Sequence, residues 1–417
     1  MSPSKNKSIY GIMGLQVLTG VLLTIFVKLM YKQTVDGNAF NHPYFQTIVS
    51  FIGQTFNFAL YFYQKQNNKK QKINQEKVLI NSNPLIEDPN ISLSQNEINL
   101  SSSQNQQKSQ SNYSFYLKLL IPATLHGLCS ICGFAAYFHM KASISMMLSG
   151  TLPVITAVLS FIFFQKKILK HQKLGMFIII VGSIFLGLTA LSHEEPIEEA
   201  NPILGITLTL LSLLFFGFLM ISEEIMLKNY EIPGTLLAGF EGLFALLISL
   251  FMIPVVSSID PNLANLDLFF EQIFQSSVLI FAIFGILFSD MLYTLFCILL
   301  TKYSSALTRS IIFQLRAIGV WFTALCIPNP PPQKGHWEQF SIVQLIGYLI
   351  LGFGVFVFQQ FIVIKYFGLD QEVELLMEQH NITNEITQDQ QNIELKNVYT
   401  PIQFDSEKES AKKKLDI

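Results

Sequence analysis

The stretch VLIFAIFGILFSDMLYTLFCILL at residues 278–300 contains one side chain that is charged in water at neutral pH, Asp290. A helix that crosses the hydrocarbon core of a bilayer needs about 20 mainly apolar residues. This stretch is long enough, and it lacks the polar–apolar alternation of a β-barrel strand. It therefore predicts a transmembrane helix that carries one carboxyl group.

The composition of the whole chain agrees with a membrane protein. Of its 417 residues, 50% are hydrophobic and 13% are charged, and its mean hydropathy is +0.41. Soluble proteins carry roughly 25% charged residues, so a cytosolic enzyme, a nucleic-acid binder and a disordered scaffold are excluded. The net charge of −2 argues separately against a polyanionic partner.

Further apolar segments have a similar length. We predict an all-α polytopic membrane protein with ten transmembrane helices, at residues 9–31, 42–64, 117–138, 143–164, 173–191, 203–223, 235–256, 278–300, 306–327 and 342–365. The segments 65–114 and 368–417 are rich in Asn, Gln and Ser instead. They hold too few apolar residues to offset the entropy of ordering, so we expect a disordered loop and tail.

Basic residues predict the orientation. Lysines concentrate in connections that share one side with the N-terminus, namely Lys65, Lys69, Lys70, Lys72, Lys77, Lys166, Lys167, Lys170, Lys173, Lys228, Lys302 and Lys365. The other side holds three lysines and an acidic run at 194–199. Positive residues favour the cytosolic side, so both termini are predicted to be cytosolic. All five Asn-X-Ser/Thr sequons, which start at Asn6, Asn90, Asn99, Asn112 and Asn381, then lie in the cytosol.

An internal repeat divides the chain. Lys141, Ser143 and Gly175, followed by a glycine-punctuated helix, are echoed by Lys302, Ser304 and Gly347. Five spans in each half is an odd number, so the halves must be inverted in the membrane. Such repeats are typical of transporters, whose substrate sites lie near the midplane. We predict a first five-helix repeat at 1–64 and 115–200 and a second at 201–367, separated from the loop 65–114 and the tail 368–417.

Several motifs, in this order along the chain, resemble the drug/metabolite transporter superfamily. The resemblance is to its EamA-like and nucleotide-sugar-transporter branch, and most closely to subfamily F of solute carrier family 35. It rests on GLQVLTG (14–20) with Lys28, HPYFQ (42–46), FIG (51–53), MLSG (147–150) with 161–167, Glu223, Glu224, GFEGLF (239–244), Thr308 to Arg316, and Trp321.

The resemblance implies two inverted five-helix repeats that exchange a small organic solute by alternating access. It implies no enzymatic activity and no cofactor, and it suggests an endomembrane of the Golgi, ER or endolysosomal system. The partners are the lipid bilayer and a small-molecule substrate, with homodimerisation left open. The chain departs from the family pattern at Ser149, where Arg is expected, and at Gln54, where Glu is expected. We hypothesise that this pair of opposite charges was lost together, since an unpaired survivor would be costly.

Ionisable residues inside spans are the first candidates for a substrate cavity, because they usually face water or one another. Arg316 lies near the midplane, and Arg309 lies two turns away on the same helical face. Together they suggest a strip that binds phosphate or carboxylate. Alternatively, Arg309 reaches the cytosolic surface, and Arg316 pairs with Asp290. Asp290 would otherwise serve proton coupling.

The remaining polar residues leave similar alternatives. Glu241 is expected in the cavity, whereas Glu223 and Glu224 are expected at a solvated boundary. Lys28 either lines the pathway or reaches the membrane surface. In the second span, Gln46, Ser50, Gly53, Asn57 and Tyr61 form a polar stripe, which either packs against a helix or lines the cavity. We favour the cavity, and we add Gln54 to its lining.

No metal site is expected. His126, Cys129 and Cys132 share one helical face, but a zinc site needs about four ligands. The leading interpretation is therefore a transporter of a nucleotide sugar or another organic anion. The alternatives are a proton-coupled metabolite exporter and a non-transporting membrane protein that recruits partners through its loop and tail.

Overall fold

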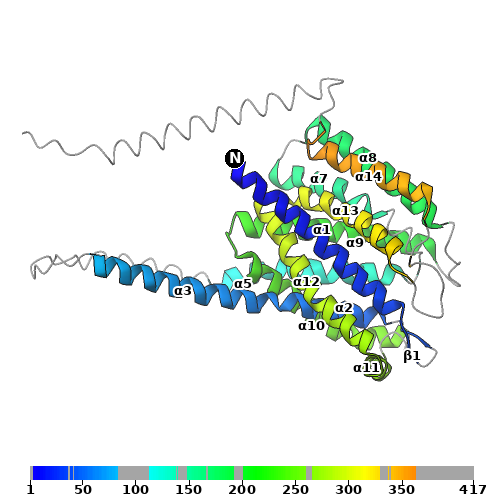
Figure 1. Cartoon of the computed structure of the whole chain (residues 1–417), viewed down its shortest axis with the longest axis horizontal. Helices are drawn as coiled ribbons and strands as arrows, with labels where there is room; N and C mark the ends of the chain where they lie inside the picture. The colour runs from blue at the N-terminus through cyan, green and yellow to red at the C-terminus, as the bar shows by residue number, and fades with distance from the viewer. Residues whose placement is uncertain are drawn as a thin grey trace, which may run out of the picture.

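The chain folds into a bundle of long helices with one short β-hairpin (Figure 1). The structure is a computed structural model that describes residues 3–35, 38–40, 42–82, 112–137, 139, 148–165, 168–191, 201–259, 265–328, 337 and 340–362. The predicted tail 368–417, the middle of the predicted loop, and Lys141, Lys166, Lys167, Lys334 and Lys365 lie outside these residues.

Helices account for nearly all of the described secondary structure. They are α1 (Pro3–Tyr31), α2 (Pro43–Thr55), α3 (Asn57–Ser82), α5 (Asn112–Tyr137), α7 (Leu152–Phe164), α8 (Lys170–Leu191), α9 (Pro202–Lys228), α10 (Gly234–Ile259), α11 (Leu266–Gln275), α12 (Ser277–Tyr303), α13 (Ala306–Cys326) and α14 (Ile342–Phe358). Strands β1 (Thr34–Val35) and β2 (Asn38–Ala39) form an antiparallel hairpin.

Within the described residues, five helices are long and apolar enough to cross a bilayer. These segments are Ser8–Tyr31, Ile203–Lys228, Gly234–Ser258, Ser277–Tyr303 and Ala306–Cys326. Shorter apolar helices occur at Lys118–Gly133, Leu152–Phe164 and Ile342–Phe358. The chain is therefore an integral multi-pass membrane protein, as the hydropathy predicts. The number of ten spans stays a prediction.

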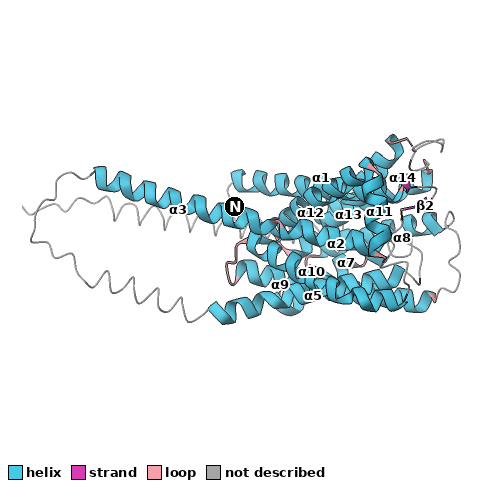
Figure 2. Cartoon of the chain, turned by 90° about the horizontal axis from the view of Figure 1, so that it is seen from below, coloured by secondary structure: helices cyan, strands magenta, loops and turns pink. Residues whose placement is uncertain are grey.

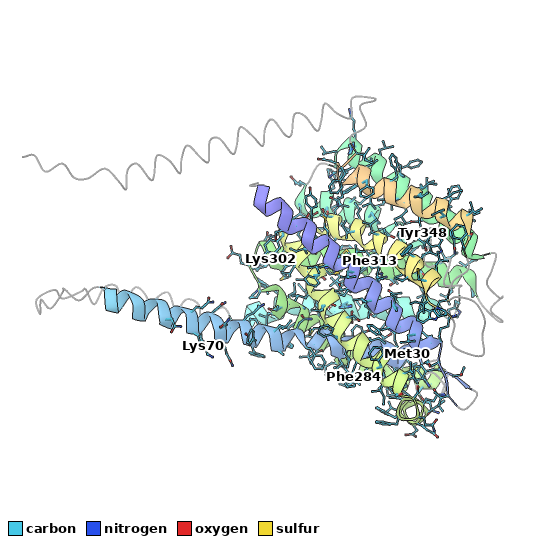
Figure 3. The ribbon with its side chains drawn as sticks, in the orientation of Figure 1. Met30, Lys70, Phe284, Lys302, Phe313 and Tyr348 are labelled. Carbon is cyan, nitrogen blue, oxygen red and sulfur yellow. The ribbon has the colours of Figure 1, made fainter. Side chains whose placement is uncertain are left out.

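The outer surface of the bundle is apolar. Phe281, Phe284 and Phe288 recur along one face of α12 and are each more than 60% exposed. Phe284 lies at the outer edge of the bundle (Figure 3). Exposed apolar stripes of this kind are unfavourable in water and are suited to contact with acyl chains.

The second predicted span is broken. Helix α2 ends at Thr55, and α3 begins at Asn57. The Asn57 side chain donates a hydrogen bond to the Gln54 carbonyl oxygen at 2.9 Å, so it competes with the backbone for a helical acceptor. Helix α3 then continues to Ser82 and projects beyond the other helices (Figure 2). Residues 65–82 are therefore helical, contrary to the expectation of disorder from residue 65, because their Lys, Gln and Glu residues favour helix.

The helix contacts are consistent with an internal two-fold relation. Helix α5 packs along α9 as α1 packs along α12, and α10 contacts α5 as α2 contacts α12. The two predicted repeats make α9 the counterpart of α1, α10 the counterpart of α2, and α12 the counterpart of α5. Replacing each helix by its counterpart turns the α5–α9 contact into the α12–α1 contact, and the α10–α5 contact into the α2–α12 contact.

Another close contact joins α8 to α14, the last helices of the two predicted repeats. A Cβ atom added at Gly175 would lie 2.7 Å from the backbone nitrogen of Phe358, and one at Gly347 would lie 2.9 Å from the Leu186 side chain. Leu186 lies 11 residues after Gly175 in α8, and Phe358 likewise lies 11 residues after Gly347 in α14. The two antiparallel helices thus present equivalent positions to each other, and glycine permits their close approach.

The two ends of the bundle differ. The N-terminus and the projecting part of α3 lie at one end, and β1 and α11 lie at the other (Figure 1). Lys302 lies toward the first end and Met30 toward the second (Figure 3). The figures show α11 end-on while the bundle helices run across the page, so α11 lies across the bundle end.

Candidate functional site

Arg309 lies in the first turn of α13 and is buried, with 6% of its surface exposed. The Ser305 hydroxyl caps this helix by accepting a hydrogen bond from the Thr308 N–H at 3.1 Å. The Arg309 guanidinium donates a hydrogen bond to Glu223 Oε2 of α9, which forms a buried ion pair. The expectation that Arg309 extends to the cytosolic surface is therefore wrong.

Glu223 and Glu224 are both fully buried, so the expectation of a solvated boundary is also wrong. Glu224 Oε2 accepts a hydrogen bond from the Ala306 N–H at 2.9 Å, and Glu224 Oε1 accepts one from Lys228 at 2.8 Å. Carboxylates are stabilised at a helix N-terminus by its unpaired N–H groups and dipole. The fold of α13 onto α9 brings both acids to such a position.

Glu241 of α10 joins this cluster, which we call the acid–arginine cluster and define as Arg309, Glu223 and Glu241. The Glu241 carboxyl lies within side-chain hydrogen-bonding reach of Glu223. Among the described residues, Glu223 Oε1, Glu241 Oε1 and Arg309 Nε are buried and have no hydrogen-bond partner. Buried polar atoms of this kind usually find a partner, so the cluster retains capacity to bind a proton, water or ligand.

Asp290 of α12 forms a second polar contact, with α2. Gln54 Nε2 donates to Asp290 Oδ2 at 3.1 Å, and Asn57 Nδ2 donates to the Met291 carbonyl oxygen at 3.2 Å. A Cβ atom at Gly53 would lie 2.6 Å from the Leu287 carbonyl oxygen. At Gly53 and Asn57 the polar stripe therefore packs against α12, which is the alternative that the sequence analysis did not favour.

Arg316 has a different environment from Arg309. Its guanidinium carbon lies 4.5 Å from the Phe313 ring centroid and 5.8 Å from that of Tyr293. Among the described residues, no carboxylate lies within ion-pair distance of Arg316, so the alternative of an ion pair with Asp290 is not observed. Cations are attracted to aromatic faces, but this contact leaves the N–H groups of the guanidinium available.

Helix α1 packs against this arginine. A Cβ atom at Gly20 would lie 2.8 Å from Arg316 Cδ. Gln16 lies one turn before Gly20 on the same face, and it is buried with neither side-chain amide atom hydrogen-bonded within the described part of the chain. One turn of α1 from its contact with Arg316 there is thus a buried amide without a partner among the described residues.

Lys28 lies in the last turn of α1, and Gln46 lies in the first turn of α2. Both side chains are partly buried, and the Tyr31 hydroxyl donates a hydrogen bond to Gln46 Oε1 at 3.4 Å. The structure therefore does not bring all eight sequence-predicted residues to one point. It places them at four places: the acid–arginine cluster, the Gln54–Asn57–Asp290 contact, the Arg316 region, and the Lys28–Gln46 end.

Gln54 and Ser149, the two departures from the family pattern, have different partners. Gln54 contacts Asp290, whereas the Ser149 carbonyl oxygen accepts a hydrogen bond from Gln314 Nε2 at 2.9 Å. The idea that they replace a former charge pair stays a hypothesis.

Two further features belong to the described residues. These residues contain no group of three His, Cys, Asp or Glu side chains placed to hold a metal ion. They form a pocket of about 270 Å³ between α3 and the start of α10, lined by Tyr61, Gln64, Lys65, Asn68, Lys69 and Pro233. The lining of this pocket includes none of the predicted site residues.

Sequence reasoning missed the roles of three residues. It did not identify Glu223 as the partner of Arg309, Tyr293 as a neighbour of Arg316, or Gln16 as a buried amide on α1. Tyr293 follows Asp290 by three residues and so shares its helical face, which is a signal that could have been used. The Glu223 pairing carried no such signal, because it joins helices distant in sequence.

Residues 99–188 match the EamA-like transporter family. The chain is 25% identical over 362 residues to solute carrier family 35 member F6 of Mus musculus, which covers 82% of this chain and 86% of that protein. The Homo sapiens protein of the same name is 24% identical over the same shares. An uncharacterized protein of Schizosaccharomyces pombe is 25% identical over 257 residues, 59% of this chain and 76% of that protein.

A crystal structure of a protein resembles the fold with a TM-score of 0.46 and 12% sequence identity, over 84% of this chain and 96% of that chain. The sequence relatives confirm the predicted resemblance as an EamA-like transporter domain and a distant homology to solute carrier family 35 member F6 over most of the chain.

Proposed function

We propose that this protein is a membrane transporter, not an enzyme, and that it moves a small organic anion by alternating access. Its similarity to the EamA-like family and to a solute carrier supports a transport function. The exchange of helix contacts between the two halves supports an arrangement of two inverted five-helix repeats and ten spans. In this arrangement the substrate binds between the halves near the midplane.

Arg316 carries the proposal for an anionic substrate. It is a partly buried guanidinium in the middle of α13, and within the described part of the chain it has aromatic neighbours but no carboxylate partner. An isolated cation at membrane depth is costly unless it meets water or an opposite charge. A phosphate or carboxylate suits it, because the planar guanidinium binds either group through two parallel hydrogen bonds.

Arg309 has no comparable role in this proposal, because Glu223 neutralises it. The proposed anion site therefore contains Arg316 and not Arg309. Tyr293 lies beside Arg316, and Gln16 lies one turn of α1 from the Gly20 that contacts Arg316. The substrate class includes nucleotide sugars, nucleotides and organic acids. We further propose that both termini face the cytosol of an endomembrane, since Lys70 on the projecting part of α3 and Lys302 lie toward the end of the bundle that holds the start of α1 (Figure 3).

The test is uptake by the full chain reconstituted in liposomes. The probes are radiolabelled UDP-glucose, AMP and citrate, with a neutral sugar as the reference. A charge-assisted hydrogen bond contributes about 1.5–3 kcal/mol, so Arg316→Ala is expected to weaken the apparent affinity about 10- to 100-fold. Arg316→Lys should recover part of it, because the charge remains but the fork is lost.

Lys302→Ala is the matched control, because it removes a cation near the end of the bundle. It should leave uptake unchanged. An Arg316→Ala protein that elutes as the wild type does on size exclusion and takes up the same anions equally well would refute the anion site. If no probe moves, the transporter proposal itself loses its support.

A further inference from the structure

The acid–arginine cluster holds two acids for one base. Arg309, Glu223 and Glu241 come from α13, α9 and α10 and have exposed fractions of 6%, 0% and 1%. Arg309 is hydrogen-bonded to Glu223 Oε2, while Oε1 of each glutamate has no partner among the described residues. The charge of Arg309 can compensate one carboxylate and not two.

Within the described part of the chain, Arg309 is the one cation that forms an ion pair with Glu223 or Glu241. Helix α5 brings His126, and α12 brings Thr301, Tyr293 and Cys297 near Arg309. Thr301 is a neutral hydrogen-bonding partner at 3.4 Å. Helix α3 brings the Phe58 ring against Gly239, and α2 brings Gln54, which contacts Asp290.

The other nearby cations are engaged elsewhere. Lys228 is paired with Glu224, and the Arg316 guanidinium lies between aromatic rings two turns further along α13. Two ionised carboxylates in the cluster would therefore leave one buried negative charge without compensation, which is strongly unfavourable. One proton between the two glutamates removes that charge, and the resulting carboxylic acid can donate a hydrogen bond to the other carboxylate.

We infer that Glu223 and Glu241 hold one proton between them in this conformation, and that this proton is the one coupled to solute movement. Glu241 is the carrier, because Glu223 is committed to Arg309. When the helices separate, the O–H bond of the Glu241 carboxyl breaks. Its proton passes to water on the open side, and the remaining carboxylate is stabilised by Arg309 and by hydration. The coupling part rests on the proposed transporter function, whereas the bound proton does not.

The bound proton has a direct spectroscopic test. The full chain in a detergent without ester groups at pH 7 is expected to show the infrared C=O stretch of a protonated carboxylic acid, and the difference spectrum between the wild type and Glu241→Gln should contain that band. Glu271→Gln, an exposed acid on α11, is the matched control and should leave it in place. Loss of the band in Glu271→Gln, or an unchanged band in Glu241→Gln, would overturn the assignment.

Coupling is tested by UDP-glucose, AMP and citrate uptake with and without an imposed pH difference. For one proton per solute, each pH unit changes the limiting accumulation ratio about tenfold. Glu241→Gln should abolish this response while equal-pH exchange of the labelled solute persists, because glutamine resembles the protonated acid. A Glu241→Gln protein that keeps the response of the wild type would refute coupling through this residue.

The two experiments separate the two ideas. If none of the three solutes moves, the transporter function fails, and the infrared band still decides whether the cluster binds a proton. If solutes move and the band is absent, transport stands and the proton site is wrong.

Discussion

The ion pair between Arg309 and Glu223 allows a quantitative test by a double-mutant cycle. Removing one partner of a buried ion pair typically costs about 3–5 kcal/mol, because the other charge stays buried without compensation. Here Glu241 lies within hydrogen-bonding reach of Glu223, so it can lose its proton and replace the missing carboxylate. We therefore expect Glu223→Gln alone to cost less than the full amount, about 1–2 kcal/mol.

The other two corners of the cycle follow from the same charge count. Glu241→Gln substitutes an uncharged amide for a carboxyl that is already protonated, so it should cost less than about 1 kcal/mol. The double variant Glu223→Gln/Glu241→Gln leaves Arg309 with no carboxylate and should cost the full 3–5 kcal/mol or so. The double variant is thus expected to be worse than the sum of the single variants by a coupling energy of about 0.5–3 kcal/mol.

The assay is thermal unfolding of the full chain in one detergent at constant pH. At about 2 °C for each kcal/mol, the double variant should melt about 6–10 °C below the wild type and Glu241→Gln within about 2 °C of it. Gln66→Ala, at an exposed position of α3, controls for nonspecific effects. Additive losses of similar size in the two single variants would show that both glutamates are ionised, and would refute the charge count.

Two further predictions concern helix packing and topology. Gly175→Ala should destabilise the protein by about 1–3 kcal/mol in the same thermal assay, because the new Cβ would meet the α14 backbone at 2.7 Å. Gly11→Ala is its control: nothing lies within 4 Å of the added Cβ, and alanine favours helix, so stability should stay equal or rise. The sequons at Asn6 and Asn381 should remain unglycosylated in eukaryotic cells, since both termini are predicted to be cytosolic. A mobility shift after glycosidase treatment of either site would overturn that orientation.

The sequence was most informative where a single physical property decides the outcome. Hydropathy alone locates α1, α9, α10, α12 and α13 closely, because a bilayer demands long apolar helices. The predicted repeat places Gly175 and Gly347 at corresponding positions, and both lie in the contact between α8 and α14. Disorder is predicted from residue 65 because that segment is polar, whereas α3 continues as a helix to Ser82. Polar composition does not separate the two outcomes, since Lys and Gln are also good helix formers.

The sequence was least informative about which polar groups meet. Glu223 lies close to the end of a predicted span, where solvation is the usual outcome. Its burial depends on how α13 packs against α9, a contact between residues far apart in the chain. The place of Arg316 in the middle of α13 was predictable from the sequence, but its contact with Tyr293 was not, since Tyr293 reaches it from another helix.

The close packing of α8 against α14 has a mechanical consequence for the alternating access that we propose. These helices belong to different predicted repeats, and at Gly175 and Gly182 the glycine of α8 faces backbone atoms of α14. Sliding or separation there would cost many contacts at once, so this pair is suited to act as a pivot. The pair lies along one edge of the bundle, and α2, α10 and α11 lie toward the other (Figure 1). A rotation about that edge leaves α8 and α14 nearly still and gives the largest displacement to the helices on the far side, which carry Gln54 and Glu241.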